Sequence, residues 1–137
     1  ASPFVLASRL KPLFLRSPCE RRFIVNVSAM EGQFTRATKT DKHPHTNMAK
    51  AALNMLTRTS AADYLADGIY MTSVDTGWIT DEKPHPDAER ARDEGFFTPL
   101  DCIDGMARVY DPIARGVNEE GEPFFGVFLK DYAPYPW

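Results

Sequence analysis

The side chains best suited to acid–base or metal chemistry in this sequence are three histidines and two cysteines. His43 and His45 stand two residues apart, and an imidazole titrates near neutral pH, so one of the pair is a candidate general acid. The alternative is that both belong to a polar loop leading into a helix. His85 is remote in the chain, and we predict no metal site. Cys19 and Cys102 have neither metal-ligand nor redox spacing, so we expect free thiols of a reducing compartment.

Glycine spacing tests for a dinucleotide site, because the chain must approach the pyrophosphate closely at a turn with glycines two residues apart. The glycines stand at positions 32, 68, 77, 95, 105, 116, 121 and 126. No pair has that spacing. The sequence therefore predicts that a dinucleotide binds only if another polypeptide supplies the glycine-rich half.

Composition sets the class of protein. The 137 residues are 43% hydrophobic and 26% charged, which is typical of one soluble globular unit. The net charge of −3 and the lack of a basic stripe argue against nucleic acid as a partner. No apolar run approaches the ~20 residues of a membrane span, so we expect a cytoplasmic or organelle-matrix location. Half of a larger fold would leave one flank bare and in need of a partner.

The elements that position these side chains alternate between helix and strand. Apolar residues recur at helical spacing over residues 4–14, with Pro12 expected to bend or end the helix. Residues 23–27 are a β-favouring run, expected to be a strand buried on both faces. Residues 47–65 predict the clearest helix, with Pro44 suited to its first turn. After Asp67-Gly68, residues 69–74 predict a parallel strand of a right-handed crossover.

The second half of the chain predicts a lid-like loop over residues 76–97, with a short charged helix at 87–94 whose face we expect to be solvated. Trp78 and Phe96–Phe97 either line a substrate pocket or are core or interface anchors. Thr98 is the candidate cap of a helix that runs to Pro112. Residues 124–129 predict a last buried strand. The fold class is α/β, the C-terminal half of a Rossmann-like doubly wound fold with about three parallel strands and flanking helices.

Three strings, in this order, resemble one family. Phe23–Ser28, followed by Gly32, is similar to a strand that ends in Asn, a hydrophobic residue and serines before a glycine. Thr46–Leu53 resembles a Tyr-x-x-x-Lys helix start with a trailing Ala-Ala-Leu. Gly68–Val74 with Gly77–Thr80 resembles a strand that leads into a Pro-Gly cofactor motif. Residues 1–131 thus resemble the C-terminal half of a short-chain dehydrogenase/reductase.

That resemblance implies NAD(P) chemistry by a Ser, Tyr and Lys constellation, from which this chain departs. Lys50 is present, but Thr46 stands where the family has the tyrosine, whose pKa of about 10 the lysine would lower. An aliphatic hydroxyl does not titrate usefully, so we expect no equivalent acid. Counting from the strand end places Ala29 at the substrate-orienting serine, with Ser28 one position earlier as a weak substitute.

The resemblance also implies which residues would contact a nicotinamide cofactor. Lys50 would hold the ribose, and Gly77, Ile79 and Thr80 would follow the cofactor motif, in which Thr76 replaces the proline. NAD or NADP would bind only after completion by an N-terminal half, and we expect no cofactor for the isolated chain.

Two functions follow from the resemblance and its departures. The first is a degenerate family member, treated as a single partial domain over residues 1–137, that acts as a non-catalytic structural or interaction component. The second is an NAD(P)-dependent oxidoreductase whose glycine-rich half sits on a missing or separate chain, with Lys50, Thr46 or His45 carrying a variant chemistry. The expected partners are that half, another protein subunit, or a second copy packed through exposed helix faces.

Overall fold

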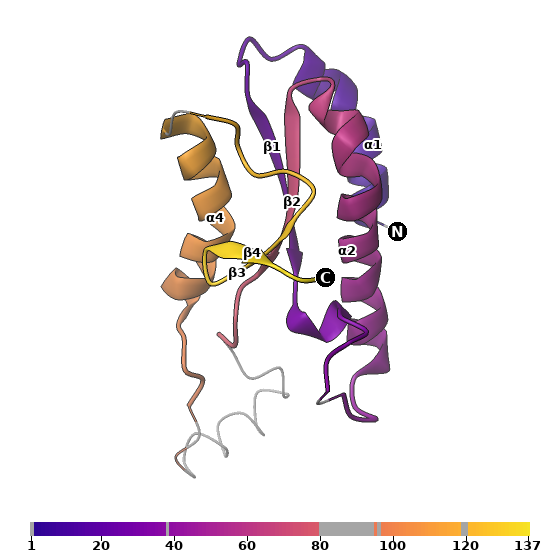
Figure 1. Ribbon diagram of the computed structural model, residues 1–137, viewed down its shortest axis with the longest axis vertical. Helices are drawn as coiled ribbons and strands as arrows, with labels where there is room; N and C mark the ends of the chain where they lie inside the picture. The colour runs from indigo at the N-terminus through magenta and orange to yellow at the C-terminus, as the bar shows by residue number, and fades with distance from the viewer. Residues whose placement is uncertain (1, 38, 80–94, 96, 119–120) are drawn as a thin grey trace.

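A computed structural model describes residues 2–37, 39–79, 95, 97–118 and 121–137. Three long helices flank a small sheet (Figure 1). The elements, in chain order, are α1 (Ser2–Leu15), β1 (Arg22–Ser28), the short 3-10 helix η1 (Met30–Gly32), α2 (Pro44–Leu65), β2 (Ile69–Asp75), α4 (Cys102–Asn118), β3 (Phe128–Lys130) and β4 (Ala133–Tyr135).

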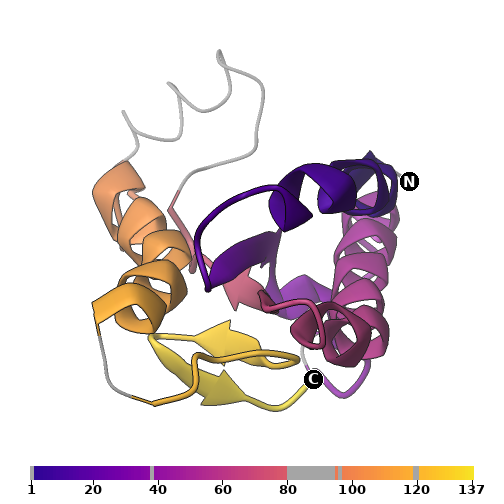
Figure 2. The same cartoon turned by 90° about the horizontal axis from the view of Figure 1, so that it is seen from above.

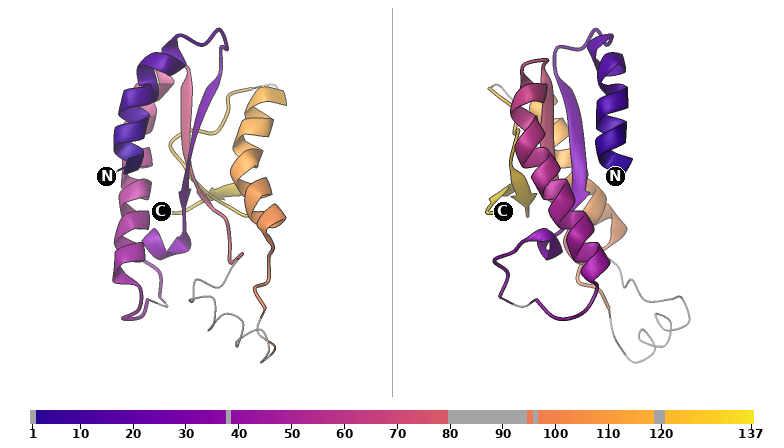
Figure 3. Two further views of the ribbon diagram at one scale, coloured as in Figure 1. Left: turned by 180° about the vertical axis from the view of Figure 1, so that it is seen from behind. Right: turned by 90° about the vertical axis from the view of Figure 1, so that its right-hand side faces the viewer.

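The sheet has the strand order β1-β2-β3-β4. β1, β2 and β3 run parallel, and β4 returns antiparallel to β3. α1 and α2 lie on one face of the sheet and α4 lies on the other, as the two views of Figure 3 show. The α/β prediction is therefore confirmed, with one more strand than the sequence suggested.

The core is centred on β2, where Ile69, Met71 and Val74 are at most 1% exposed. Phe128 and Leu129 of β3 extend this core, and Ala61 and Tyr64 of α2 cover it. The prediction that the first strand is buried on both faces is wrong. β1 is the outermost strand, so most of its residues are half-buried and Val27 is 42% exposed.

The turn from α2 into β2 requires a glycine at position 68. Gly68 has φ of +67°, and a side chain there would place a Cβ 2.9 Å from the carbonyl oxygen of Glu20. Both constraints favour glycine. The Asp67–Gly68 break predicted from the sequence is confirmed at this position.

The helix after the loop differs from its prediction at both ends. It begins at Cys102 and continues through the buried Pro112 to Asn118. Asp101, and not Thr98, caps it, because Asp101 Oδ1 accepts the backbone N–H groups of Ile103 and Asp104 at 2.8 and 2.9 Å. The helix passes Pro112 because packing against the sheet outweighs the cost of one lost backbone hydrogen bond.

The last strand is shorter than predicted. Only Phe128–Lys130 forms β3. The two residues before it already contact β2, because the Gly126 N–H donates to the Met71 carbonyl oxygen at 2.8 Å and the Val127 carbonyl oxygen accepts the Ser73 N–H at 3.0 Å. The tail contributes the unpredicted β4, reached through Asp131 and Tyr132, both with positive φ. The predicted lid over 76–97 and its short helix at 87–94 fall mostly outside the described residues. None of the helices in the described ranges has the length and apolar run needed to cross a bilayer.

Candidate functional site

The candidate site lies at the carboxyl ends of β1 and β2. In a parallel sheet these ends meet at one edge, where open α/β folds bind ligands. The strand register places Ser28 directly beside Asp75. η1 follows β1 at this edge, and the N-terminal part of α2 packs against η1.

Lys50 is held at this edge by the strand that precedes it. Its ammonium donates a hydrogen bond to the carbonyl oxygen of Val27 at 2.9 Å. Thr46 lies one turn earlier on α2 and is half-buried. The structure therefore places Lys50 beside β1 with Thr46 on the same side of α2.

Ser28 turns its hydroxyl inward. The side chain is 2% exposed, and its Oγ lies 2.5 Å from Asn54 Oδ1 and 3.2 Å from the Lys50 carbonyl oxygen. Both of these oxygens accept hydrogen bonds, so the single Ser28 proton is directed into the protein. Ala29 cannot replace it, because it has no hydroxyl.

A buried polar seam continues from Ser28 between the sheet and α2. Asn26 Nδ2 donates to Thr57 Oγ1 at 2.9 Å, and Thr57 Oγ1 lies 2.8 Å from Ser73 Oγ. Asn54 Nδ2 is buried without a partner in the described residues. Such seams fix the register of a helix on a sheet, because shifting the helix would break several buried hydrogen bonds together.

The turn after β2 brings two further sequence-predicted residues to the site. Gly77 has φ of +74°, and a Cβ there would lie 2.5 Å from Leu100 Cδ1. The Thr76 hydroxyl donates to the Gly77 carbonyl oxygen at 3.3 Å. Ile79 packs on Gly105 of α4, where an added Cβ would lie 2.8 Å from Ile79 Cδ1. The turn is thus fixed against the first part of α4.

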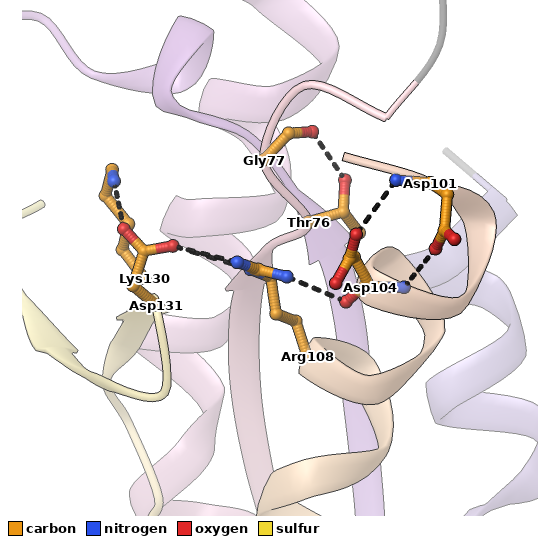
Figure 4. Close-up of polar contacts among 7 residues, drawn as sticks. All are labelled: Thr76, Gly77, Asp101, Asp104, Arg108, Lys130 and Asp131. Atoms are coloured by element: carbon orange, nitrogen blue, oxygen red, sulfur yellow. Dashed lines mark hydrogen bonds and ion pairs between the residues drawn. The ribbon is translucent and has the colours of Figure 1, made fainter. Parts of the chain in front are cut away.

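Arg108 joins that part of α4 to the β3–β4 turn (Figure 4). Its guanidinium donates to the Asp104 carbonyl oxygen at 2.9 Å and to Asp131 Oδ1 at 3.3 and 3.4 Å. The Lys130 ammonium binds the other carboxylate oxygen of Asp131 at 2.5 Å. That hydrogen bond lowers the pKa of Asp131 and raises the pKa of Lys130. These contacts tie α4 to the end of β3 and the turn that follows it.

Asp75 is a buried carboxyl group at the centre of this edge. It is 7% exposed, and its Oδ1 accepts the backbone N–H of Met30 at 3.3 Å. Loss of hydration on burial raises the pKa of Asp75, although the Met30 N–H and the charge of Lys130 act in the opposite direction. The Asp75 carboxyl group ties η1 to the end of β2.

We predict that Asp75→Asn removes a pH dependence of stability. The raised folded-state pKa of Asp75 means that the folded protein binds this proton more tightly than the unfolded chain does. The resulting contribution to the free energy of unfolding is fully present below the unfolded-state pKa of about 3.9 and is lost as pH rises through the folded-state pKa. The amide oxygen can still accept the Met30 N–H without carrying charge. Urea unfolding from pH 4 to pH 7 is expected to show the variant gaining stability relative to wild type as pH rises. The exposed Asp41→Asn is the control, and an equal gain there would contradict the assignment.

The remaining predicted residues do not gather at one point. His43 and His45 are exposed at the start of α2, with ring centroids 6.3 Å apart. The replacement-acid role of either histidine stays a prediction. Thr80 and His85 lie outside the described residues. Across the described ranges, no three His, Cys, Asp or Glu side chains gather as metal ligands, and Cys19 and Cys102 are free and exposed.

Three residues of this edge were missed by reasoning from the sequence. Asp75 had a signal, since an acidic residue directly after a buried strand falls at the ligand-binding edge of an α/β sheet. Arg108 and Asp131 had none. They are 23 residues apart, and only the packing of α4 beside β3 brings them together.

Comparison with known proteins supports the fold. The chain superimposes on the carbonyl reductase Sniffer of D. melanogaster with a TM-score of 0.69 and 22% identity. For the NADPH-bound carbonyl reductase from chicken fatty liver the values are 0.65 and 20%. In both cases 98% of this chain is covered but only 52% of the other, so the chain spans about half their length. The chain therefore has the fold of one half of these carbonyl reductases, which are Rossmann-type short-chain dehydrogenase/reductase structures.

Sequence comparison adds one relative. The chain is 37% identical over 102 residues to a protein of Acanthamoeba polyphaga mimivirus described as "Uncharacterized protein R665". The match covers 70% of this chain and 21% of the viral protein. No family model matches the chain.

Proposed function

We propose that this chain is a short-chain dehydrogenase/reductase-like component that does not itself transfer hydride and acts through association with another polypeptide. The observation that carries the proposal is Thr46, one turn before Lys50 on α2. A threonine hydroxyl cannot give up or take a proton in the useful range. A reaction at a carbonyl oxygen would therefore lack its acid.

Two contacts support the proposal. The Lys50 ammonium donates one hydrogen bond to the Val27 carbonyl oxygen, and position 46 holds no phenol whose pKa it could lower. The Ser28 hydroxyl is buried and directed to Asn54. Neither arrangement presents a hydroxyl proton to a substrate at the sheet edge.

A nicotinamide cofactor fits this chain incompletely. Lys50 and the Gly77 turn lie at the edge where a ribose and a carboxamide would be held. The eight glycines provide no pair two apart, so the chain has no cradle for the pyrophosphate. Cofactor binding would therefore require a second polypeptide that supplies this cradle.

The second candidate is an NAD(P)-dependent oxidoreductase whose glycine-rich half is supplied by another chain. What favours it is the preserved Gly77 turn, whose positive φ and contact with Leu100 leave no room for a side chain. The half-length match to carbonyl reductases also agrees with it. In this candidate, His45 or the Thr46 position would have to carry the proton by a variant chemistry.

The test is cofactor binding and turnover by the isolated chain and its Thr46→Tyr variant. We expect neither protein to change its intrinsic fluorescence or melting temperature with millimolar NADH or NADPH, because both lack the phosphate cradle. We also expect no oxidation of either cofactor in the presence of a carbonyl compound. Turnover by the wild-type chain alone would contradict both candidates. Turnover only after a glycine-rich half is added would favour the second candidate.

A further inference from the structure

The turn between β3 and β4 has a backbone conformation that its residues do not favour. Asp131 and Tyr132 have φ of +47° and +67°. A two-residue hairpin turn with positive φ at both positions usually contains glycine or asparagine, because a Cβ makes this conformation costly in free energy. Tyrosine is poorly suited to it. Contacts outside the turn must therefore hold the turn in place.

α4 supplies those contacts. The Arg108 guanidinium donates to Asp131 Oδ1 at 3.3 and 3.4 Å, and it lies 5.1 Å from the centroid of the Tyr132 ring. The Arg108 side chain is only 11% exposed, so water screens this ion pair less than a pair on the open surface. One arginine thus fixes both residues with positive φ.

The segment after the turn crosses to the face of the sheet that α2 covers. Phe128 stands beside Ser73 in the register, and Ser73 Oγ lies 2.8 Å from Thr57 Oγ1 of α2, so the Phe128 side chain is on the α2 side. The Trp137 ring packs on Phe128 with centroids 6.2 Å apart. Figure 2 shows β3 and β4 between α4 and α2, with the C-terminus beside α2.

Gln33 fastens this segment to η1. Gln33 directly follows η1, is 5% exposed and donates a hydrogen bond from Nε2 to the carbonyl oxygen of Pro136. A buried amide that lost this acceptor would destabilise the fold. The bond joins a residue that follows β1, at one edge of the sheet, to a residue that follows β4, at the other edge.

η1 has two further attachments, and both lie at the candidate site. The Met30 N–H donates to Asp75 Oδ1 at 3.3 Å. Gly32 lies so close to α2 that an added Cβ would be 2.7 Å from the carbonyl carbon of Lys50. Any displacement of η1 therefore changes the contacts of Asp75 and of the Lys50 backbone.

We infer that residues 131–137 form a strap that holds η1 against α2 and β2, and that the ion pair of Arg108 with Asp131 keeps this strap closed. When the ion pair breaks, relief of the positive φ values favours opening, and Gln33 loses its acceptor. η1 then keeps only its contacts with Asp75 and Lys50. The strap couples α4 to the edge of the sheet that carries Lys50. This inference goes beyond the proposed function and does not depend on whether the chain transfers hydride.

The first test opens the strap from the turn, in the full 137-residue chain. Asp131→Asn removes the charge and keeps a residue type that tolerates positive φ. The N–H groups of Gly32 and Gln33 bond to carbonyl oxygens within η1 and its flanks. We expect these two amides to exchange with deuterium ~10-fold faster or more, because η1 loosens. Amides of β2 should keep their wild-type exchange rates, because the opening is local.

The second test opens the strap from η1. Gln33→Leu removes the donor to Pro136 and keeps a side chain of similar size. The β4 amides of Ala133 and Tyr135 are expected to exchange ~10-fold faster or more. Trp137 provides an optical signal in a Trp78→Phe background, where it is the only tryptophan. Its emission should shift to longer wavelength when the strap opens.

Two further variants complete the design. Arg108→Met removes the same ion pair from the α4 side, so it should reproduce the changes caused by Asp131→Asn even if that variant folds poorly. The matched control is Asp63→Asn, which weakens the ion pair of an exposed carboxylate with Lys11 of α1 and should leave η1 and β4 unchanged.

Three outcomes would overturn the inference. The first is faster exchange in β4 without a change in η1 when the ion pair is removed. The second is faster exchange in η1 without a change in β4 or in Trp137 emission for Gln33→Leu. The third is equal acceleration throughout β2, which would show that the variants destabilise the whole fold and do not open a strap.

Discussion

Replacing Phe128 with Ala is expected to lower the free energy of unfolding by about 3–5 kcal/mol, the range for removing a fully buried phenylalanine. Phe128 is 0% exposed at the start of β3. Its ring packs against Tyr135 and Trp137 at centroid distances of 6.4 and 6.2 Å. Its loss leaves a cavity between the sheet and the C-terminal tail. Urea denaturation followed by circular dichroism measures the change.

The matched control for this prediction is Phe34→Ala. Phe34 is 86% exposed, so its removal opens no cavity and should change the free energy of unfolding by less than ~0.5 kcal/mol. Equal effects for the two variants would contradict the assignment of Phe128 to the core. A loss confined to Phe128→Ala would support the short β3 as an anchor of the tail.

Replacing Gly32 with Ala is expected to destabilise the protein by about 1–3 kcal/mol through overpacking. A Cβ at this position would lie 2.7 Å from the Lys50 carbonyl carbon and 2.8 Å from the Ala51 nitrogen. These are backbone atoms in the middle of a helical turn, so they cannot rotate away. The variant must push α2 from η1, which would shift Lys50 from Val27. Thermal and urea unfolding measure the loss of stability.

Gly105→Ala provides the comparison. There the added Cβ would meet only side-chain atoms of Ile79, the nearest at 2.8 Å, and α4 would gain helix propensity of up to ~1 kcal/mol. We expect a net change near zero. If Gly32→Ala were as mild as Gly105→Ala, the close approach of η1 and α2 would be wrong.

The polar residues at the carboxyl ends of the strands are placed as in a ligand-binding site but contact other parts of the protein. Lys50, Ser28 and the Gly77 turn lie at the carboxyl ends of β1 and β2, where an α/β protein would bind a ligand. The contacts they make are internal: with a strand carbonyl, with Asn54 and with Leu100. This pattern supports the proposed non-catalytic function.

Local sequence patterns were enough to predict α2, β2 and the turn between them. Helix propensity over α2, Pro44 in its first turn and the Asp67–Gly68 break act within a few residues, so the sequence alone carries them. The same holds for two chemical conclusions that depend only on residue identity. These are the threonine at position 46 and the lack of a glycine-rich turn.

Tertiary packing decided the rest, because the responsible contacts join residues remote in the sequence. α4 continues through Pro112 because its packing on the sheet outweighs the local preference for a helix end at proline. The regular strand β3 begins only at Phe128, although the β-favouring run begins earlier. The exposure of β1 follows from its outermost place in the strand order, which no window of residues encodes. The inward turn of Ser28 and the pairing of Arg108 with Asp131 likewise exist only once helices and strands meet.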